Sequence, residues 1–288
     1  ISAFLYFSIS DYQIMLRNYY YLNRAVTELN SLLLGVNVTE IFSQDKDLLL
    51  FSVPTDDYLY RHLVISTNSS LPYLLIKQDH RKAKKNVVEF DNLFLPDKII
   101  KIAIADNDRI ISIELERMII YFSAMGGKTN VYFTKNNLII NQFKKGKSEV
   151  DLIERIAQHI FVTNSTYHKI DKNTFIGFDH KKIRAEYSYI SREILNELIV
   201  RNTVMDDLEK DFHQILSEIF NSEINLFYNQ TEEKIRFVPT SFKSFGTTDD
   251  AVNFSNYNSA LISFISKYYS YDVIVRTKKE INKFITKE

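Results

Sequence analysis

The sequence predicts an α+β fold: an N-terminal helix, an antiparallel β-sheet or sandwich, and a helical subdomain after it. Apolar residues recur at three- and four-residue spacing in residues 15–34, which is the pattern of an amphipathic helix. Short runs with strand character, separated by polar, Asn, Gly and Pro turns, then continue to about residue 143. Helical spacing returns after residue 144, so strands and helices occupy separate parts of the chain.

The elements of the first half follow in chain order. Gly35 is placed to end the first helix. The expected strands are residues 36–43, 47–53, 62–67 and 73–78, then 99–105, 109–115, 118–123, 130–134 and 138–143. A short helical connection is expected at residues 90–95 between the two groups. The second group should form a meander of hairpins, because its turns carry Asp-Asn-Asp, Gly-Gly-Lys and Lys-Asn-Asn.

The second half begins with helices and then returns to mixed character. Helices are expected at residues 150–160, 188–200 and 204–220, with a turn-rich stretch at 170–184. Strands at 224–228 and 234–239 and closing helices at 251–269 and 272–285 follow. We therefore expect three parts: a β-rich domain at 15–145, a helical subdomain at 146–222, and a β hairpin with closing helices at 223–288.

The composition limits the classes of partner. The 288 residues are 45% hydrophobic, so the chain can bury a substantial core. Lys plus Arg and Asp plus Glu number 36 each, so a polyanion must meet a local basic patch. The absence of cysteine excludes disulfides and zinc ribbons and fits a cytoplasmic protein. No apolar run reaches the ~18 residues that a membrane helix needs, so no membrane partner is expected.

No catalytic, metal or cofactor pattern is present in the sequence. It contains no nucleophile elbow, P-loop or dinucleotide fingerprint, and its 6 glycines leave little room for one. The 6 histidines show no metal-ligand spacing, so each is expected to be a surface or a satisfied core residue. We therefore expect a non-catalytic protein with no cofactor and no metal.

Two turns between expected strands give the most specific signal. One is Asp106-Asn107-Asp108-Arg109, and the other is Met125-Gly126-Gly127-Lys128-Thr129-Asn130, whose glycines can supply positive φ. With the segments around them, these turns resemble the N-terminal domain of NFACT proteins, also called the fibronectin-binding protein A family. The other segments that carry the resemblance are Glu28-Leu29, Gln44, Ile65-Ser66 and Phe237-Val238-Pro239. The sequence departs from the family pattern at Asn23, Ser123 and Thr129.

The resemblance covers nearly the whole chain and implies both a fold and a function. The family's N-terminal module is similar to the N-terminal domain of formamidopyrimidine-type DNA glycosylases, and a helix-hairpin-helix-like part follows it. NFACT proteins bind a large ribosomal subunit that carries a stalled peptidyl-tRNA, and they recruit tRNA to extend the nascent chain without mRNA. Glycosylase activity is not expected here, because no Pro precedes Pro54 and zinc-finger cysteines are missing.

The resemblance assigns tRNA contact to Asp108 and Arg109. An Arg guanidinium can stack on an unpaired base and bond its edge, while the neighbouring carboxylate orients it or accepts from an amino group. The alternative is structural, with Asp108 capping the hairpin turn and Arg109 on its exposed face. Arg17, Asn23 and Arg24 of the first helix are further candidates for tRNA contact.

Other aromatic and basic residues are weaker candidates for RNA contact. Of the adjacent Tyr19, Tyr20 and Tyr21, at least one is expected to be exposed, where it can stack on a base. Basic runs are usually solvated, and phosphate contact would instead show as a steep salt dependence. The candidates for phosphate contact are Lys128, Arg81, Lys82, Lys84, Lys85, Lys181, Lys182 and Arg184.

A second class of function stays open at this point. Some bacterial relatives bear fibronectin-binding names, so the alternative is an adhesin-like module that binds host matrix proteins. The opening residues 1–10 lack the basic start and cleavage site of a secretory signal, which favours the ribosomal function.

Overall fold

A computed structural model of the chain shows two compact units, Ile1–Asn221 and Ser222–Glu288. The structure describes residues 16, 18–55, 60–78, 80–90, 93–145, 149–163, 179–187, 189–201, 208–229, 234–239, 242–245 and 251–285. Along the chain, the division between the units falls one residue before the expected boundary between residues 222 and 223. The expected boundary at residue 145 lies inside the first unit. The division into three parts stays a prediction.

The first unit begins with helix α2 (Tyr19–Leu33). The side chain of Asn18 accepts a hydrogen bond from Tyr20 N at 2.9 Å, which caps the first turn. Gly35 follows the helix with a φ of 82°, a left-handed conformation that costs glycine little. The expected amphipathic helix that ends at Gly35 is therefore confirmed.

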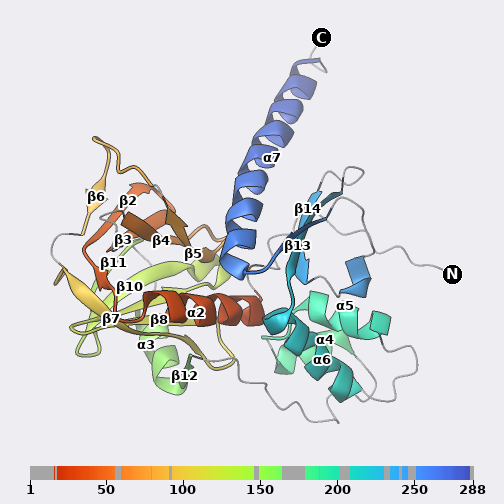
Figure 1. The fold of residues 1–288 in the computed structure, drawn as a ribbon, viewed down its shortest axis with the longest axis horizontal. Coiled ribbons are helices and arrows are strands. Elements are labelled where there is room, and N and C mark those ends of the chain that lie inside the picture. Colours follow the sequence, from red (N-terminus) through yellow and green to blue (C-terminus); the bar gives the residue numbers. More distant parts are fainter. Residues whose placement is uncertain are drawn as a thin grey trace. The chain divides into compact units, whose positions relative to one another are not determined.

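Two antiparallel sheets follow in the described part of the first unit, which confirms the expected α+β class (Figure 1). The five-stranded sheet has the order β5-β4-β3-β2-β6. Its strands are β2 (Glu40–Asp45), β3 (Leu48–Pro54), β4 (Tyr60–Ser66), β5 (Tyr73–Gln78) and β6 (Val88–Glu89). Strand β6 was not expected from the sequence, because its two residues are too short to show a pattern.

The seven-stranded sheet contains the expected meander of hairpins. Its order is β1-β7-β8-β9-β10-β11, and β12 also pairs with β7. Its strands are β1 (Asn37–Val38), β7 (Asp97–Ala105), β8 (Ile110–Leu115), β9 (Ile119–Ser123), β10 (Asn130–Lys135), β11 (Leu138–Gln142) and β12 (Phe161–Val162), and the short 3₁₀ helix η2 (Gly126–Lys128) precedes β10. The helical connection expected at residues 90–95 is wrong for the described residues there, which adopt no helix.

Four helices in the described residues complete the first unit: α3 (Glu149–Gln158), α4 (His180–Glu186), α5 (Arg192–Arg201) and α6 (Leu208–Asn221). Leu152 of α3 packs on the sheet with Ala105, Ile110, Tyr121 and Tyr132, so α3 covers one face of the seven-stranded sheet. Helix α4 occupies part of the stretch expected to be turn-rich. Asp179 makes this short helix possible, because its carboxylate accepts from Lys181 N at 2.8 Å.

The first two turns of helix α2, Tyr19–Val26, are buried on all sides, so the expectation of an exposed tyrosine is wrong. Tyr19, Tyr20 and Tyr21 are each 1% exposed or less. The helix packs against β7 and also against α6, which leaves no solvent-facing side at this end. The Tyr20 ring lies 6.5 Å from the Phe212 ring and 6.3 Å from the Phe220 ring in edge-to-face geometry.

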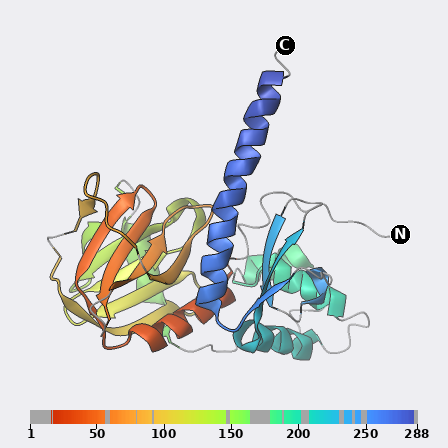
Figure 2. The same cartoon turned by 45° about the horizontal axis from the view of Figure 1, so that its top comes forward.

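The second unit is a small sheet with a long helix. Strands β13 (Ile224–Asn229), β14 (Lys234–Pro239) and β15 (Val252–Phe254) pair in the order β14-β13-β15, and η4 (Lys243–Phe245) is a single turn. The two expected closing helices are one helix, α7 (Tyr257–Ile285), which Figure 2 shows as continuous. No Gly or Pro interrupts this stretch, so nothing ends the helix between the expected pieces. The Phe237 ring anchors its first turns, 5.2 Å from Tyr257 and 5.7 Å from Phe264.

Candidate nucleic-acid interface

The two family-like turns lie side by side at one end of the seven-stranded sheet. Ile110 of β8 pairs with Ser123 of β9, so the turn before β8 adjoins the loop after β9. The amide of Ala124 donates to the carbonyl oxygen of Arg109 at 2.9 Å and joins the two segments directly. We call residues 106–109 and 124–129 together the turn-end surface.

Asp108 of this surface is held by two side chains, one near the end of α3 and one just after it. Its Oδ1 accepts from Arg109 N at 2.7 Å. Its Oδ2 forms an ion pair with Arg155 and lies 3.3 Å from His159 Nε2. Asp108 is only 8% exposed, so both carboxylate oxygens are engaged within the protein. The structural alternative for Asp108 is therefore present in the fold, whereas its tRNA contact stays a prediction.

The backbone of the 106–109 turn is held by hydrogen bonds within the turn and to Ile160, the residue before β12. Asn107 adopts a φ of 63°, which Asn tolerates better than most residues. The amide of Asp108 donates to Ala105 O at 3.2 Å, and the amide of Asp106 donates to Ile160 O at 2.8 Å. Arg109 is half-buried at the end of this turn.

The 124–129 loop shows why its motif contains Gly, Thr and Asn. Gly126 has a φ of 51°, and its carbonyl accepts from the Thr129 hydroxyl at 2.7 Å. Asn130 links β10 to the residues after β11, because its Oδ1 accepts from Lys144 N at 2.8 Å and its Nδ2 donates to Lys144 O at 2.9 Å. Thr129 and Asn130 therefore shape the loop, and Lys128 is exposed on it.

Tyr19 lies behind the turn-end surface. Burial raises the pKa of its hydroxyl well above the ordinary value, and the Asp106 carboxylate adds to this rise. The nearby polar groups of the Asn107 backbone and the Asn23 side chain lower the pKa of the same hydroxyl. Tyr19 therefore couples α2 to the back of the turn as a neutral phenol.

The candidate residues of the first helix are not exposed in this structure. Asn23 is 0% exposed and lies beside Tyr19. Arg24 is 5% exposed, and its Nη1 donates to Ile219 O at 2.8 Å, which ties α2 to α6. Arg17 lies outside the described residues. The tRNA contacts of these three residues stay predictions, and the described contacts of Arg24 are structural.

The basic residues of the 81–85 run lie on a loop that crosses the five-stranded sheet. Strands β5 and β6 are at opposite edges of this sheet, so residues 80–87, which we call the crossing loop, pass over its face. Lys82 is used within the fold: it pairs with Glu89 at 2.5 Å and Glu40 at 3.3 Å, and its ammonium lies 5.1 Å from the centre of the Phe42 ring. Arg81, Lys84 and Lys85 are exposed.

The third basic group is on another element. Lys181, Lys182 and Arg184 are exposed on the short helix α4. The structure therefore brings Arg109 and Lys128 onto one surface, while the other expected phosphate contacts lie on the crossing loop and on α4.

Sequence reasoning missed three residues behind the turn-end surface: Arg155, His159 and Tyr19 as a partner of the turn. Arg155 and His159 are four residues apart, which places both on one side of the α3 end. This spacing is the only local signal for them, because Arg155 lies 47 residues from Asp108 in the sequence and His159 lies farther still.

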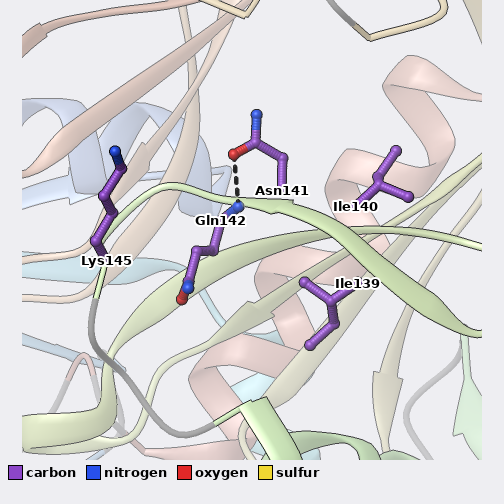
Figure 3. Close-up of a pocket in the computed structure, with 5 residues that line it drawn as sticks. All are labelled: Ile139, Ile140, Asn141, Gln142 and Lys145. Atoms are coloured by element: carbon purple, nitrogen blue, oxygen red, sulfur yellow. Dashed lines mark hydrogen bonds between the residues drawn. The ribbon is translucent and has the colours of Figure 1, made fainter.

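A shallow depression of about 350 Å³ lies along the edge strand β11 (Figure 3). It is lined by Ile139, Ile140, Asn141, Gln142 and Lys145, and Asn141 Oδ1 accepts from Gln142 N at 2.8 Å. These residues include no acid and base pair. Within the described residues, no cluster of His, Asp or Glu could hold a metal ion, and no helix is long and apolar enough to cross a membrane.

Known families and structures agree with this fold. A family model described as the NFACT N-terminal and middle domains matches residues 18–288. The chain belongs to the NFACT family. Two of the segments by which its sequence resembles NFACT proteins are thus the turns of the turn-end surface, which the fold places together.

Two solved structures are similar to this NFACT chain. The fibrinogen binding protein from Staphylococcus aureus is 19% identical, with 86% of this chain and 98% of that chain covered and a TM-score of 0.64. The N-terminal part of the fibronectin/fibrinogen-binding protein from Streptococcus suis is 15% identical, with 86% and 98% covered and a TM-score of 0.62. At these identities the likeness shows the fold. Comparison with curated protein sequences gives no match.

Proposed function

We propose that this chain is the tRNA-binding and large-ribosomal-subunit-binding module of a cytoplasmic ribosome-associated quality-control factor. Such a factor binds a subunit that carries a stalled peptidyl-tRNA and supports extension of the nascent chain without mRNA. Membership of the NFACT family supports this proposal. The observation that carries it is the turn-end surface, where Arg109 sits on a fixed turn beside the loop that bears exposed Lys128.

The chemistry of this surface suits an RNA with unpaired bases. The Arg109 guanidinium can stack on a splayed base and bond its edge, and Lys128 can contact a phosphate that positions the strand. The module itself is non-catalytic in this proposal and needs no cofactor, because peptide-bond formation belongs to the ribosome.

A mobility-shift titration with total tRNA tests the proposal directly. We expect the double variant Asp108→Ala/Arg109→Ala to bind at least about tenfold more weakly than the wild type, the loss that one bidentate Arg contact gives. The control is Lys101→Ala/Glu114→Ala, which removes a 3.5 Å ion pair from the same β7–β8 hairpin. Unchanged affinity in the Asp108/Arg109 variant, with folding intact, contradicts the assignment.

The second candidate function is binding of fibronectin or fibrinogen. The names of the two similar structures favour it, since those proteins are described as fibrinogen-binding or fibronectin/fibrinogen-binding. The same preparation can be tested on immobilised fibronectin and fibrinogen. Saturable binding there, together with no binding of tRNA, would favour this candidate over the ribosomal one.

A further inference from the structure

The contacts of Asp108 assign different tasks to the two members of the Asp108-Arg109 pair. We propose that Arg155 and His159 are positioning residues for tRNA recognition: they hold Asp108, Asp108 holds Arg109, and only Arg109 of the pair touches the RNA. This inference rests on the proposed function and names further residues of the same site.

Both oxygens of the Asp108 carboxylate have partners within the protein. Oδ1 accepts from the Arg109 amide at 2.7 Å, and Oδ2 faces both Arg155, with which it forms an ion pair, and His159 Nε2 at 3.3 Å. The Asp108 side chain is only 10% exposed, so a base amino group could reach its carboxylate only if the turn opened and disturbed this largely buried ion pair. Removing one partner from such a pair is costly, because the other charge is left uncompensated.

Arg109 is the member of the pair that is suited to contact RNA. Its amide is bound by Asp108, and its carbonyl accepts from Ala124 N at 2.9 Å, so its backbone is fixed on both sides. A side chain that starts from a fixed backbone loses less conformational entropy on binding than one on a free loop. Arg109 is also less buried than Asp108, which suits it better for contact with RNA.

A positioning role and a purely electrostatic role for Asp108 differ in the sign of their effect. If the carboxylate acts on RNA only through its charge, Asp108→Asn removes a repulsion from the phosphates and tightens or preserves binding. If the carboxylate positions Arg109, the same change loosens the turn and weakens binding. Loss of Arg155 weakens binding in both cases, so the tRNA affinities of the Asp108 and Arg155 variants must be compared.

A double-mutant cycle with total tRNA tests the inference in the intact protein. We expect Asp108→Asn and Arg155→Gln each to weaken binding by roughly tenfold, and the double variant to be no weaker than the weaker single variant. Arg155→Lys keeps a cation for Oδ2 and should recover most of the affinity. Tighter or unchanged binding by Asp108→Asn, or single effects that multiply in the double variant, would overturn the inference.

Two controls separate positioning from simple destabilisation and from failure of the function. The cycle Lys101→Gln with Glu114→Gln removes an ion pair from the same hairpin and should leave tRNA affinity unchanged. Hydrogen exchange of the Arg109 amide should accelerate in Asp108→Asn and Arg155→Gln, while amides of the central strands keep their protection. If the wild type binds no tRNA, the proposed function fails with the inference; if the wild type binds and the single effects multiply, only the inference fails.

Discussion

The turn-end surface and the crossing loop both present basic residues, but the fold holds them differently. At the turn-end surface, the backbone of Arg109 is bound through its amide and its carbonyl, and a buried ion pair stands behind it. On the crossing loop, Lys82 is paired with two carboxylates. Arg81, Lys84 and Lys85 are exposed and make no ion pair within the described part of the chain.

This difference teaches that the number of cations in a segment does not measure its part in recognition. The crossing loop has the denser run of charge, yet its exposed side chains form no ion pair with the described residues. Such residues attract phosphates without selecting them, whereas a fixed Arg can read the face or edge of a base. Specific recognition is therefore expected at the turn-end surface and salt-sensitive attraction at the crossing loop.

The largest expected effect is the loss of tRNA affinity in Arg109→Ala. We compare it with the triple variant Arg81→Gln/Lys84→Gln/Lys85→Gln. Arg109→Ala should lower tRNA affinity by about tenfold or more at every salt concentration, because it removes a base contact. The triple variant should lose affinity mainly at low salt. Its slope of log affinity against log salt should fall by about 2 if all three side chains contact phosphates of a single strand. Titrations at several salt concentrations measure both quantities.

The outcome can also break the proposed contrast. If Arg109→Ala changes the salt slope and the triple variant lowers affinity equally at all salt concentrations, the assignments of the two regions are reversed. Lys46→Gln is a suitable control, since Lys46 is an exposed cation in the β2–β3 turn, outside both regions. It should leave the slope unchanged.

The strands of the meander can be predicted from sequence because their turns are local. Asn107, Asn136 and Asn137 adopt φ values of 63°, 51° and 62°, and Asn is a residue that sequence reasoning already places in such turns. The exposure of the tyrosines cannot be predicted in this way. Whether α2 has one packing partner or two depends on α6, which follows far along the chain.

The candidate site is likewise predictable from sequence where it is local in the chain, and not where it depends on distant partners. The two turns are visible as motifs, and their neighbourhood follows once β8 and β9 are paired. The partners of single charges are not visible: Arg24 is expected at an RNA surface but donates to Ile219 O, and Lys82 is a candidate for phosphate contact but is paired with Glu40 and Glu89. These partners lie far away in sequence or on another strand, so no local pattern encodes them.

The crossing loop should also respond to pH, with a smaller effect. Gln44 Oε1 accepts from Ala83 N, which turns the Gln44 amide nitrogen toward His80 Nε2 at 2.8 Å, so this His80 nitrogen must accept. Protonation of His80 removes this acceptor and so breaks the Gln44–His80 hydrogen bond, one of the links between the crossing loop and β2. The charged groups that face His62 and His80 are Lys77 on β5 and Asp45 and Glu40 on β2. The two histidine rings also face each other.

The direction of the pH effect follows from the pKa values. Burial lowers the pKa of both His62 and His80 below the ordinary value of 6.5, with Lys77 adding to the effect on His80. Between these folded pKa values and 6.5, the unfolded chain binds more protons, so the free energy of unfolding should fall as the pH drops below 6.5 and stay level above it. Urea denaturation from pH 7.5 downward should show this fall, and His62→Gln/His80→Gln should lose it. The same fall in that variant would place its source elsewhere.

The smallest expected effect belongs to Lys82, and it sharpens the contrast within the crossing loop itself. Lys82→Met should reduce the free energy of unfolding by at most about 1 kcal/mol, because its partners Glu40 and Glu89 are 53% and 43% exposed and solvent screens such pairs. Hydrogen bonding to Glu89 raises the pKa of Lys82, as expected for a cation whose charge is already compensated. The salt slope of tRNA binding should therefore not change. Lys84→Met, two residues away, should do the opposite: it should lower the salt slope and leave urea unfolding unchanged. Equal effects of the two variants would show that pairing within the fold does not decide which of these lysines contacts RNA.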